Sequence, residues 1–199
     1  MTTAFRFCLL AAGLAALPTL ARADWKAVEK VQTYAVTGKT GPELYESIGQ
    51  NGPKVSVGRT IALTNFKLTW RRDYRPQSDG SCMLASAQPN LVITYTLPKP
   101  AAKLSSPMKE HWDVFAGGLR RHELVHGQRI KDMVTEIVAF SVGFSAPNDP
   151  GCKKIRIELT KLLAAASQAQ RQHSRDFDRV EMSDGGNVHQ LILRLVNGQ

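Results

Sequence analysis

Long apolar stretches are missing from this sequence beyond its N-terminal region. A bilayer span needs roughly 20 apolar residues, and the longest run, Phe7–Leu20, is shorter than that. It follows Arg6 and is followed by a small-x-small cleavage site that ends at Ala23, which is the pattern of an export signal. We therefore predict that residues 1–23 are a signal peptide, that no membrane span remains after its cleavage, and that the protein is periplasmic or secreted.

Cysteine is scarce as well. One of the three cysteines, Cys8, lies in the predicted signal peptide, which leaves Cys82 and Cys152. The mature chain therefore offers no cluster of thiolates for a cysteine-ligated metal site. Two cysteines in an exported chain meet an oxidising compartment and are expected to pair. We predict a disulfide between Cys82 and Cys152 that joins the sheet to the start of the second long helix.

Repeated clusters of basic and aromatic residues, typical of nucleic-acid-binding proteins, are also missing. The chain has 26 Lys and Arg against 17 Asp and Glu, a formal net charge of +9, but its basic residues are scattered. We expect no nucleic acid among its partners and interpret the charge as a contribution to solubility. Internal repeats and low-complexity segments are absent too, so residues 24–199 are expected to form a single domain.

The first half of the mature chain, residues 24–106, has the pattern of a small antiparallel sheet. Short β-branched runs alternate there with Gly, Pro, Asn and Asp, which mark the turns. A short helix is expected to begin near Pro42. The predicted strands are Val31–Val36, Val55–Leu63, Phe66–Tyr74, Cys82–Ser86 and Leu91–Leu97.

The pattern becomes helical in residues 107–199. From about Met108 onward apolar residues recur at steps of three and four, which predicts long amphipathic helices. The first is expected to end near Val142 and the second to begin near Lys153, because the residues between are rich in Pro and Gly. The tail His189–Val196 fits either a strand or a helix.

This order of elements predicts the α+β fold class. Strands that precede helices in the chain fold as a sheet covered by helices on one face. We therefore expect a small antiparallel sheet packed against a long helical hairpin.

The segment His122–His126 of the first long helix has the form HExxH. One helical turn separates the two histidines, so both imidazoles lie on one face and can reach one metal ion, with Glu123 beside them. Two histidines and a third protein ligand hold Zn²⁺ while a fourth position stays open for water. Glu123 then acts as the general base that deprotonates this water. The segment predicts Zn²⁺ as cofactor and peptide-bond hydrolysis as the reaction.

The third zinc ligand is not fixed by the HExxH segment. Asp132 has the spacing found in zinc proteases whose chain turns sharply after the second histidine, but a continuing helix places it about 15 Å from His122. Antiparallel packing of the two predicted helices instead brings His173 level with His122. Asp176 and Asp178 follow about one turn later and are also candidates, either as ligands or as groups that orient a ligating histidine.

The chain resembles a bacterial family called domain of unknown function 922, described as predicted secreted zinc-dependent proteases. The resemblance covers most of the mature chain and includes the leader, "LTW", the "TLPKP" exit from the strand-rich half, "RRHELVHG", Cys152 and "DFDRVEMSDGG". Its specific elements are the HExxH segment and the pair Phe177-Asp178. The resemblance implies a zincin-like domain and makes Asp178 a ligand or an orienting partner of a ligand.

The chain departs from the family pattern after Phe177-Asp178. The family usually continues with Thr and then His-Gly, whereas this chain has Glu181 near the Thr and Ser183-Asp184-Gly185 near the His-Gly. A histidine expected there is therefore absent. We predict that the third ligand lies between His173 and Asp184, with His173 and Asp178 as the leading candidates.

Two functions from different classes fit these observations. The first is a secreted or periplasmic zinc-dependent metallopeptidase whose peptide or protein substrate adds as a strand to a sheet edge. The second is a non-enzymatic envelope protein that uses the helical hairpin as an interaction surface, with a structural metal or none. A bound metal with an open water position distinguishes the first function from the second.

Overall fold

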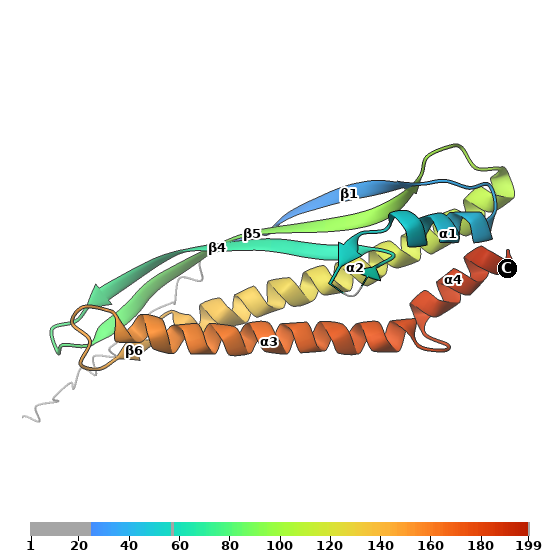
Figure 1. The fold of residues 1–199 in the computed structure, drawn as a ribbon. Coiled ribbons are helices and arrows are strands. Elements are labelled where there is room, and N and C mark those ends of the chain that lie inside the picture. The colour runs from blue at the N-terminus through green and yellow to red at the C-terminus, as the bar shows by residue number, and fades with distance from the viewer. Residues whose placement is uncertain (1–24, 57, 199) are drawn as a thin grey trace, which may run out of the picture.

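The computed structural model describes residues 25–56 and 58–198, so the predicted signal peptide at residues 1–23 lies outside the described residues. The described chain is elongated, with a sheet along one side and long helices along the other (Figure 1), which confirms the α+β class. Its elements are β1 (Val28–Val36), α1 (Gly41–Asn51), β2 (Lys54–Val55), β3 (Gly58–Arg59), β4 (Leu63–Pro76), β5 (Cys82–Pro100), α2 (Ser106–Ser141), β6 (Ser145–Ala146), α3 (Lys154–Met182) and α4 (Asn187–Asn197).

The main sheet is mixed, and the prediction of a purely antiparallel sheet is wrong. Its strand order is β1-β5-β4, with β6 paired to the start of β5. β4 and β6 run antiparallel to β5, but β1 runs parallel to it. Parallel pairing needs a long crossover connection, which the chain between β1 and β5 supplies. In this strand order, β4 forms one edge of the sheet.

Several strand boundaries also differ from the predicted ones. Cys82–Ser86 and Leu91–Leu97 belong to one long strand, β5, because Gln88–Asn90 stay in register with β4. Of the predicted strand Val55–Leu63, Val55 belongs to the short strand β2, Gly58 and Arg59 form β3, and Leu63 begins β4. The tail His189–Val196, which fitted either state, is helical in α4.

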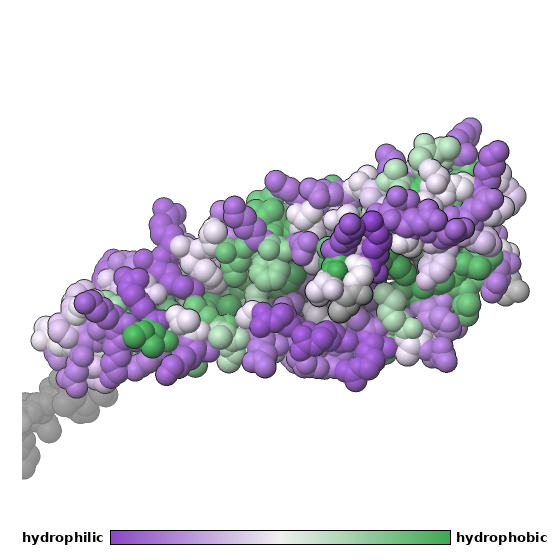
Figure 2. All heavy atoms as spheres, viewed as in Figure 1, coloured by the Kyte–Doolittle hydropathy of each residue, from purple (hydrophilic) through white to green (hydrophobic). Residues whose placement is uncertain are grey.

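Helix α2 is fixed against the inner face of the sheet by a continuous apolar contact. Burying one Leu or Ile side chain contributes about 1.5–3 kcal/mol, so this contact sets the position and rotation of α2. The contacting side chains are Leu91, Ile93 and Tyr95 of β5 and Ile130, Met133, Val134 and Ile137 of α2. Helix α3 lies alongside α2, and its outer side is mainly hydrophilic in Figure 2. Among the described residues, no helix has the length and apolar character needed to cross a membrane.

The predicted disulfide between Cys82 and Cys152 is confirmed. The two Cα atoms lie 5.3 Å apart, and both cysteines are buried in an apolar cluster with Leu84 and Ile155. The bond therefore joins the start of β5 to the turn that precedes α3, at the end of the molecule where β6 lies (Figure 1).

Replacing Cys82 and Cys152 together by Ser is expected to lower the free energy of unfolding by about 4 kcal/mol. The bond closes a separation of 70 residues, and a loop of that length removes much entropy from the unfolded chain. Denaturant unfolding of the oxidised wild type, the reduced wild type and the double variant measures the difference. Equal unfolding midpoints in all three samples would show that the disulfide does not stabilise the fold.

Candidate metal centre

The HExxH segment lies in the middle of α2, on the line of side chains that faces the protein interior. Leu119 and Ile130 of this line are buried apolar residues, and between them His122 and Glu123 are each 5% exposed. The two residues thus take positions where the pattern calls for apolar side chains. Buried polar groups are costly unless they are paired or bind a metal, so their burial calls for partners.

Three metal-binding atoms converge at this point, and the third comes from α3. The Nε2 atoms of His122 and His126 lie 3.1 Å apart, and Oδ1 of Asp178 lies 3.1 Å from the first and 2.8 Å from the second. Three atoms bound to one tetrahedral zinc ion lie roughly 3.4 Å from each other, given bonds of 2.0–2.1 Å. The set His122, His126 and Asp178 therefore fits one metal ion with a further coordination position.

Phe177 fixes the orientation of both imidazole rings. Its ring stacks on His122, with centroids 4.8 Å apart and an angle of 16° between the planes, and meets His126 edge-on at 5.4 Å. The guanidinium of Arg129 lies 4.6 Å from the centroid of the Phe177 ring. This packing restricts rotation of the rings, so their Nε2 atoms are held toward the same point.

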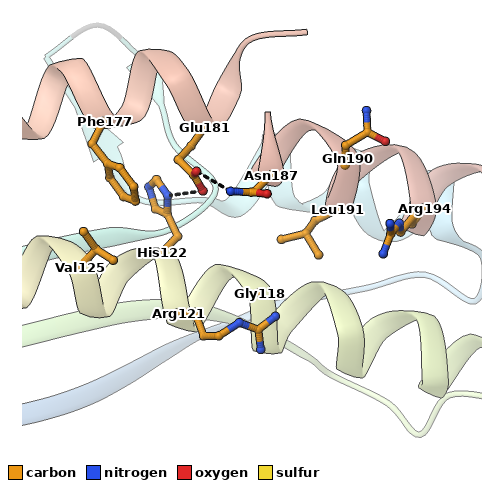
Figure 3. A pocket seen from close by; sticks show the side chains of 10 residues that line it. All are labelled: Gly118, Arg121, His122, Val125, Phe177, Glu181, Asn187, Gln190, Leu191 and Arg194. Atoms are coloured by element: carbon orange, nitrogen blue, oxygen red, sulfur yellow. Dashed lines mark hydrogen bonds and ion pairs between the residues drawn. The ribbon is translucent and has the colours of Figure 1, made fainter. Parts of the chain in front are cut away.

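A second carboxylate faces the other nitrogen of His122. The buried Nδ1 of His122 has no hydrogen-bond partner among the described residues, and Oε2 of Glu181 lies 3.7 Å from it. The amide of Asn187 donates a 2.7 Å hydrogen bond to Oε1 of Glu181 (Figure 3). A ligating histidine usually directs its second N–H toward a carboxylate. Glu181 therefore stands where such an orienting carboxylate is needed, and Asn187 of α4 holds it there.

Replacing Glu181 by Ala is expected to weaken the affinity of the centre for a divalent metal ion, with zinc as the probe, about 10- to 100-fold, the usual effect of losing a group that orients a ligating histidine. Competition with a chelator of known affinity measures the change. Glu158→Ala serves as control, because Glu158 lies on the same helix, away from the two histidines, and its carboxylate lies 3.9 Å from the amino group of Lys154. If both variants bind zinc as tightly as the wild type, Glu181 does not orient His122.

The carboxylate of Glu123 is held by the sheet. Oγ1 of Thr64 in β4 donates a 2.6 Å hydrogen bond to Oε2 of Glu123. Burial raises the pKa of Glu123, while the Thr64 hydrogen bond and the two histidines lower it, and the net result is a pKa above the usual range. A carboxylate with a raised pKa has the proton affinity that a general base requires.

The centre is rich in negative charge. Burial lowers the pKa of His122, but Asp178, Glu123 and Glu181 together outweigh this effect and raise it. Burial raises the pKa of Asp178, but the hydrogen bonds and charges of His122 and His126 hold it well below its usual range. Three carboxylates thus surround two imidazoles. A divalent cation bound between them compensates this excess of negative charge.

Two cavities flank the centre. The first, of about 550 Å³, is lined by Glu123, His126 and Asp178 together with β4 and α3. The second, of about 540 Å³, lies between the middle of α2, the end of α3 and α4, and is lined by His122 and Phe177 (Figure 3). Of these two cavities, only the first is lined by Glu123, so it is the cavity on the β4 side that gives access to this carboxylate.

The other residues considered as third ligands lie outside the converging set. His173 is exposed, and its backbone carbonyl accepts a hydrogen bond from Arg129. Asp132 is exposed and accepts a 2.8 Å hydrogen bond from Gln128. Asp176 pairs with a neighbouring arginine on α3. The structure therefore brings Asp178, and none of these three, to the two histidines.

Sequence reasoning did not identify Thr64 or Asn187, and it noted Glu181 only as a departure from the family pattern. Thr64 lies 59 residues before Glu123, in another element, so no local spacing connects them. Glu181 had a detectable signal, because it follows Asp178 and Phe177 by three and four residues and so lies on the same helical face.

Gly127, directly after the HExxH segment, makes room for the buried ring of Tyr95. A Cβ atom at residue 127 would lie 2.0 Å from the hydroxyl oxygen of Tyr95. Tyr95 is 3% exposed, and burial raises its pKa to about 12, so it remains a neutral phenol. Glycine is therefore required for α2 to approach β5 closely at this point.

Replacing Gly127 by Ala is expected to lower the free energy of unfolding by about 1–3 kcal/mol, the usual cost of overpacking a core. Gly117→Ala is the control, since the nearest atom to a Cβ there is Nη1 of Arg121 at 3.6 Å, an ordinary contact. That change is expected to be neutral or to stabilise α2 by up to about 1 kcal/mol. Thermal unfolding compares the two, and equal stability would contradict the steric explanation.

Comparison with known proteins identifies the family of the chain. A family model described as "Bacterial protein of unknown function (DUF922)" matches residues 31–186, which include the converging histidines and Asp178. No curated protein and no solved structure matches the chain. Because the family match spans well over half of the sequence, the chain belongs to the DUF922 family of bacterial proteins of unknown function.

Proposed function

We propose that the protein is a zinc-dependent metallopeptidase. The observation that carries the proposal is the convergence of His122, His126 and Asp178 next to the buried carboxylate of Glu123. Two imidazoles and one carboxylate are a ligand set that catalytic zinc sites use, with a fourth position left for water. Zinc is favoured over Mg²⁺ or Ca²⁺ because those ions prefer oxygen ligands.

The arrangement of three ligands and two further carboxylates fits a catalytic zinc site better than a closed structural one. Structural zinc sites are completed by a fourth protein ligand. The two nearby carboxylates are occupied elsewhere, since Glu123 accepts a hydrogen bond from Thr64 and Glu181 accepts one from Asn187. The cavity beside Glu123 gives water and a peptide access to the open position.

The reaction uses the side chains in distinct roles. Bound zinc supplies a Lewis acid that lowers the pKa of a water molecule toward about 7. Glu123 accepts the proton of the attacking water and returns it to the leaving nitrogen of the cleaved peptide bond. Thr64 holds the carboxylate of Glu123 in place, and Phe177 holds the imidazole of His122.

We propose further that residues 24–199 form one zincin-like domain in which α2 and α3 act as a helical hairpin. The strand-rich half, 24–106, supplies Thr64 and the β4 wall of the cavity, and the helical half, 107–199, supplies the metal ligands. A periplasmic or secreted location, reached through a signal peptide at residues 1–23, is supported by the bacterial family and by the disulfide, which oxidising compartments favour.

A second candidate function is a non-enzymatic envelope protein that binds a partner through α2 and α3. Exposed apolar side chains on α3 favour it, since Ile157 is 62% and Val180 66% exposed. In this function the metal is structural or absent, and the protein cleaves no peptide.

Metal analysis and peptide cleavage of the mature protein test the two candidates together. The protein is purified from a bacterial periplasm, its zinc content is measured, and it is incubated with a library of peptides whose products are identified by mass spectrometry. The peptidase proposal expects about one zinc per chain, and cleavage that a chelator abolishes and added zinc restores. A metal-free protein, or a zinc-loaded protein that cleaves no peptide, would contradict it and support the second function.

A further inference from the structure

Two arginines of α3 line the same cavity as the metal-binding group. Arg171 and Arg175 face the space in which Glu123 and Asp178 lie. The lining residues from β2 to β4, by contrast, are uncharged. The positive charge of this cavity therefore comes from α3, on the wall opposite the sheet edge.

These two arginines have no carboxylate partner in the part of the chain that the structure describes. Nη1 of Arg171 donates a 2.6 Å hydrogen bond to the hydroxyl of Ser167, and Arg175 donates to the amide oxygen of Gln172. Both acceptors are neutral groups on the same helix. Each guanidinium therefore keeps its full charge and free N–H groups for a ligand in the cavity.

The neighbouring arginines are engaged differently. Arg179 forms an ion pair with Asp176. Arg129 covers the Phe177 ring and donates to a backbone carbonyl of α3. Of these four arginines, Arg171 and Arg175 are the two that line the cavity beside Glu123, and their side-chain hydrogen bonds go to neutral side chains of α3.

The geometry allows an extended peptide to reach both arginines and the metal centre. β4 is an edge strand, and in the described part of the chain no strand pairs with its outer edge; an extended peptide can add there. Arg175 and Arg171 precede Asp178 by three and seven residues, which is about 5 and 10 Å along the helix axis. An extended peptide rises about 3.3 Å per residue, so these distances correspond to one to three substrate residues.

We infer that the substrates are acidic peptides, in which an Asp or Glu one to three residues from the cleaved bond binds Arg171 and Arg175. Guanidinium groups bind carboxylates through paired, charge-assisted hydrogen bonds. This inference rests on the proposed peptidase function and adds the class of its substrate.

Matched peptides test the inference. The zinc-loaded mature protein is given fluorogenic peptides of one sequence that carry Glu, Gln or Lys at each of the three positions on either side of the cleaved bond, and kcat/KM is measured. At one or more positions on one side, kcat/KM for the Glu peptide is expected to exceed that for the Gln peptide about tenfold, because a carboxylate forms charge-assisted hydrogen bonds with a guanidinium and an amide does not. Lys is expected to be cleaved more slowly than Gln.

Variants separate the two arginines from the overall charge. Arg171→Gln with Arg175→Gln is expected to reduce the ratio of kcat/KM for the Glu peptide to that for the Gln peptide to about one. Arg171→Glu with Arg175→Glu is expected to reverse the preference, so that the Lys peptide is cleaved faster than the Glu peptide. Lys161→Gln is the control, because it removes a positive charge from an exposed position of α3 outside the cavity and should leave the ratio unchanged. Zinc content of each variant confirms that the centre is intact.

Each outcome decides a different point. Equal cleavage of the three peptides by the wild type, or an unchanged preference in the double Gln variant, would overturn the inference and leave the peptidase function standing. Failure to cleave any peptide with zinc bound would overturn the peptidase function itself, and the inference with it.

Discussion

Asp178→Ala is expected to lose zinc, while His173→Ala is expected to keep it. Asp178 supplies the oxygen that lies within 3.1 Å of both Nε2 atoms, whereas the imidazole of His173 is not among the converging groups. Removing a direct ligand should weaken binding by more than the roughly 10- to 100-fold that follows the loss of an outer partner. Competition with a chelator, together with zinc content after dialysis, measures both variants.

Asp132→Ala provides the second control for this experiment. Asp132 lies on α2 and is bound by Gln128, so its loss should leave zinc affinity unchanged. If His173→Ala loses zinc and Asp178→Ala does not, the ligand set read from the structure is wrong. If all three variants keep zinc, the metal is bound elsewhere.

The choice between His173 and Asp178 shows what the sequence could not determine. The predicted ends of the two helices were close to correct, since α2 ends at Ser141 and α3 begins at Lys154. The residue predicted to lie opposite His122 was wrong because the prediction assumed that the end of α2 lies level with the start of α3. The connection instead contains β6, which pairs with β5, and the residue opposite His122 is Asp178, five residues further along α3.

The residues of α3 that face the protein interior were predicted only in part. The three- and four-residue periodicity of the second helix places His173, Phe177 and Val180 on one predicted inward face, yet Phe177 is half-buried while the other two are exposed. Periodicity gives the average direction of a helix face, but α3 buries few of its residues, namely Ile155, Leu159 and Gln170. The inward residues near its end are therefore set by the crossing of the two helices, which no local pattern encodes.

The sequence pattern also could not predict whether β1 pairs parallel or antiparallel to its neighbour. A run of alternating residues predicts a strand but not its neighbour, and β1 is exposed along most of its length. Little apolar burial therefore distinguishes a parallel from an antiparallel pairing. The HExxH segment was recognisable for the opposite reason, because its two histidines and glutamate depend only on the spacing within one helix.

Glu123→Gln is expected to keep zinc and to lower kcat/KM for peptide hydrolysis by about 10²- to 10⁴-fold, the usual contribution of a general base. The glutamine amide keeps the size of the side chain, and its oxygen can still accept the hydrogen bond of Thr64. What it lacks is a basic oxygen that takes up a proton. Zinc content and kcat/KM are measured on the same preparation, so metal loss and loss of chemistry are separated.

Glu136→Gln is the matched control, because Glu136 is an exposed residue of the same helix and its change should affect neither quantity. Equal hydrolysis by the Glu123→Gln variant and the wild type would exclude Glu123 as the base. Loss of zinc in that variant would instead make Glu123 a metal ligand, and the centre would then be a closed four-ligand site of the structural kind. Retained zinc with lost hydrolysis is the combination that only the peptidase function predicts.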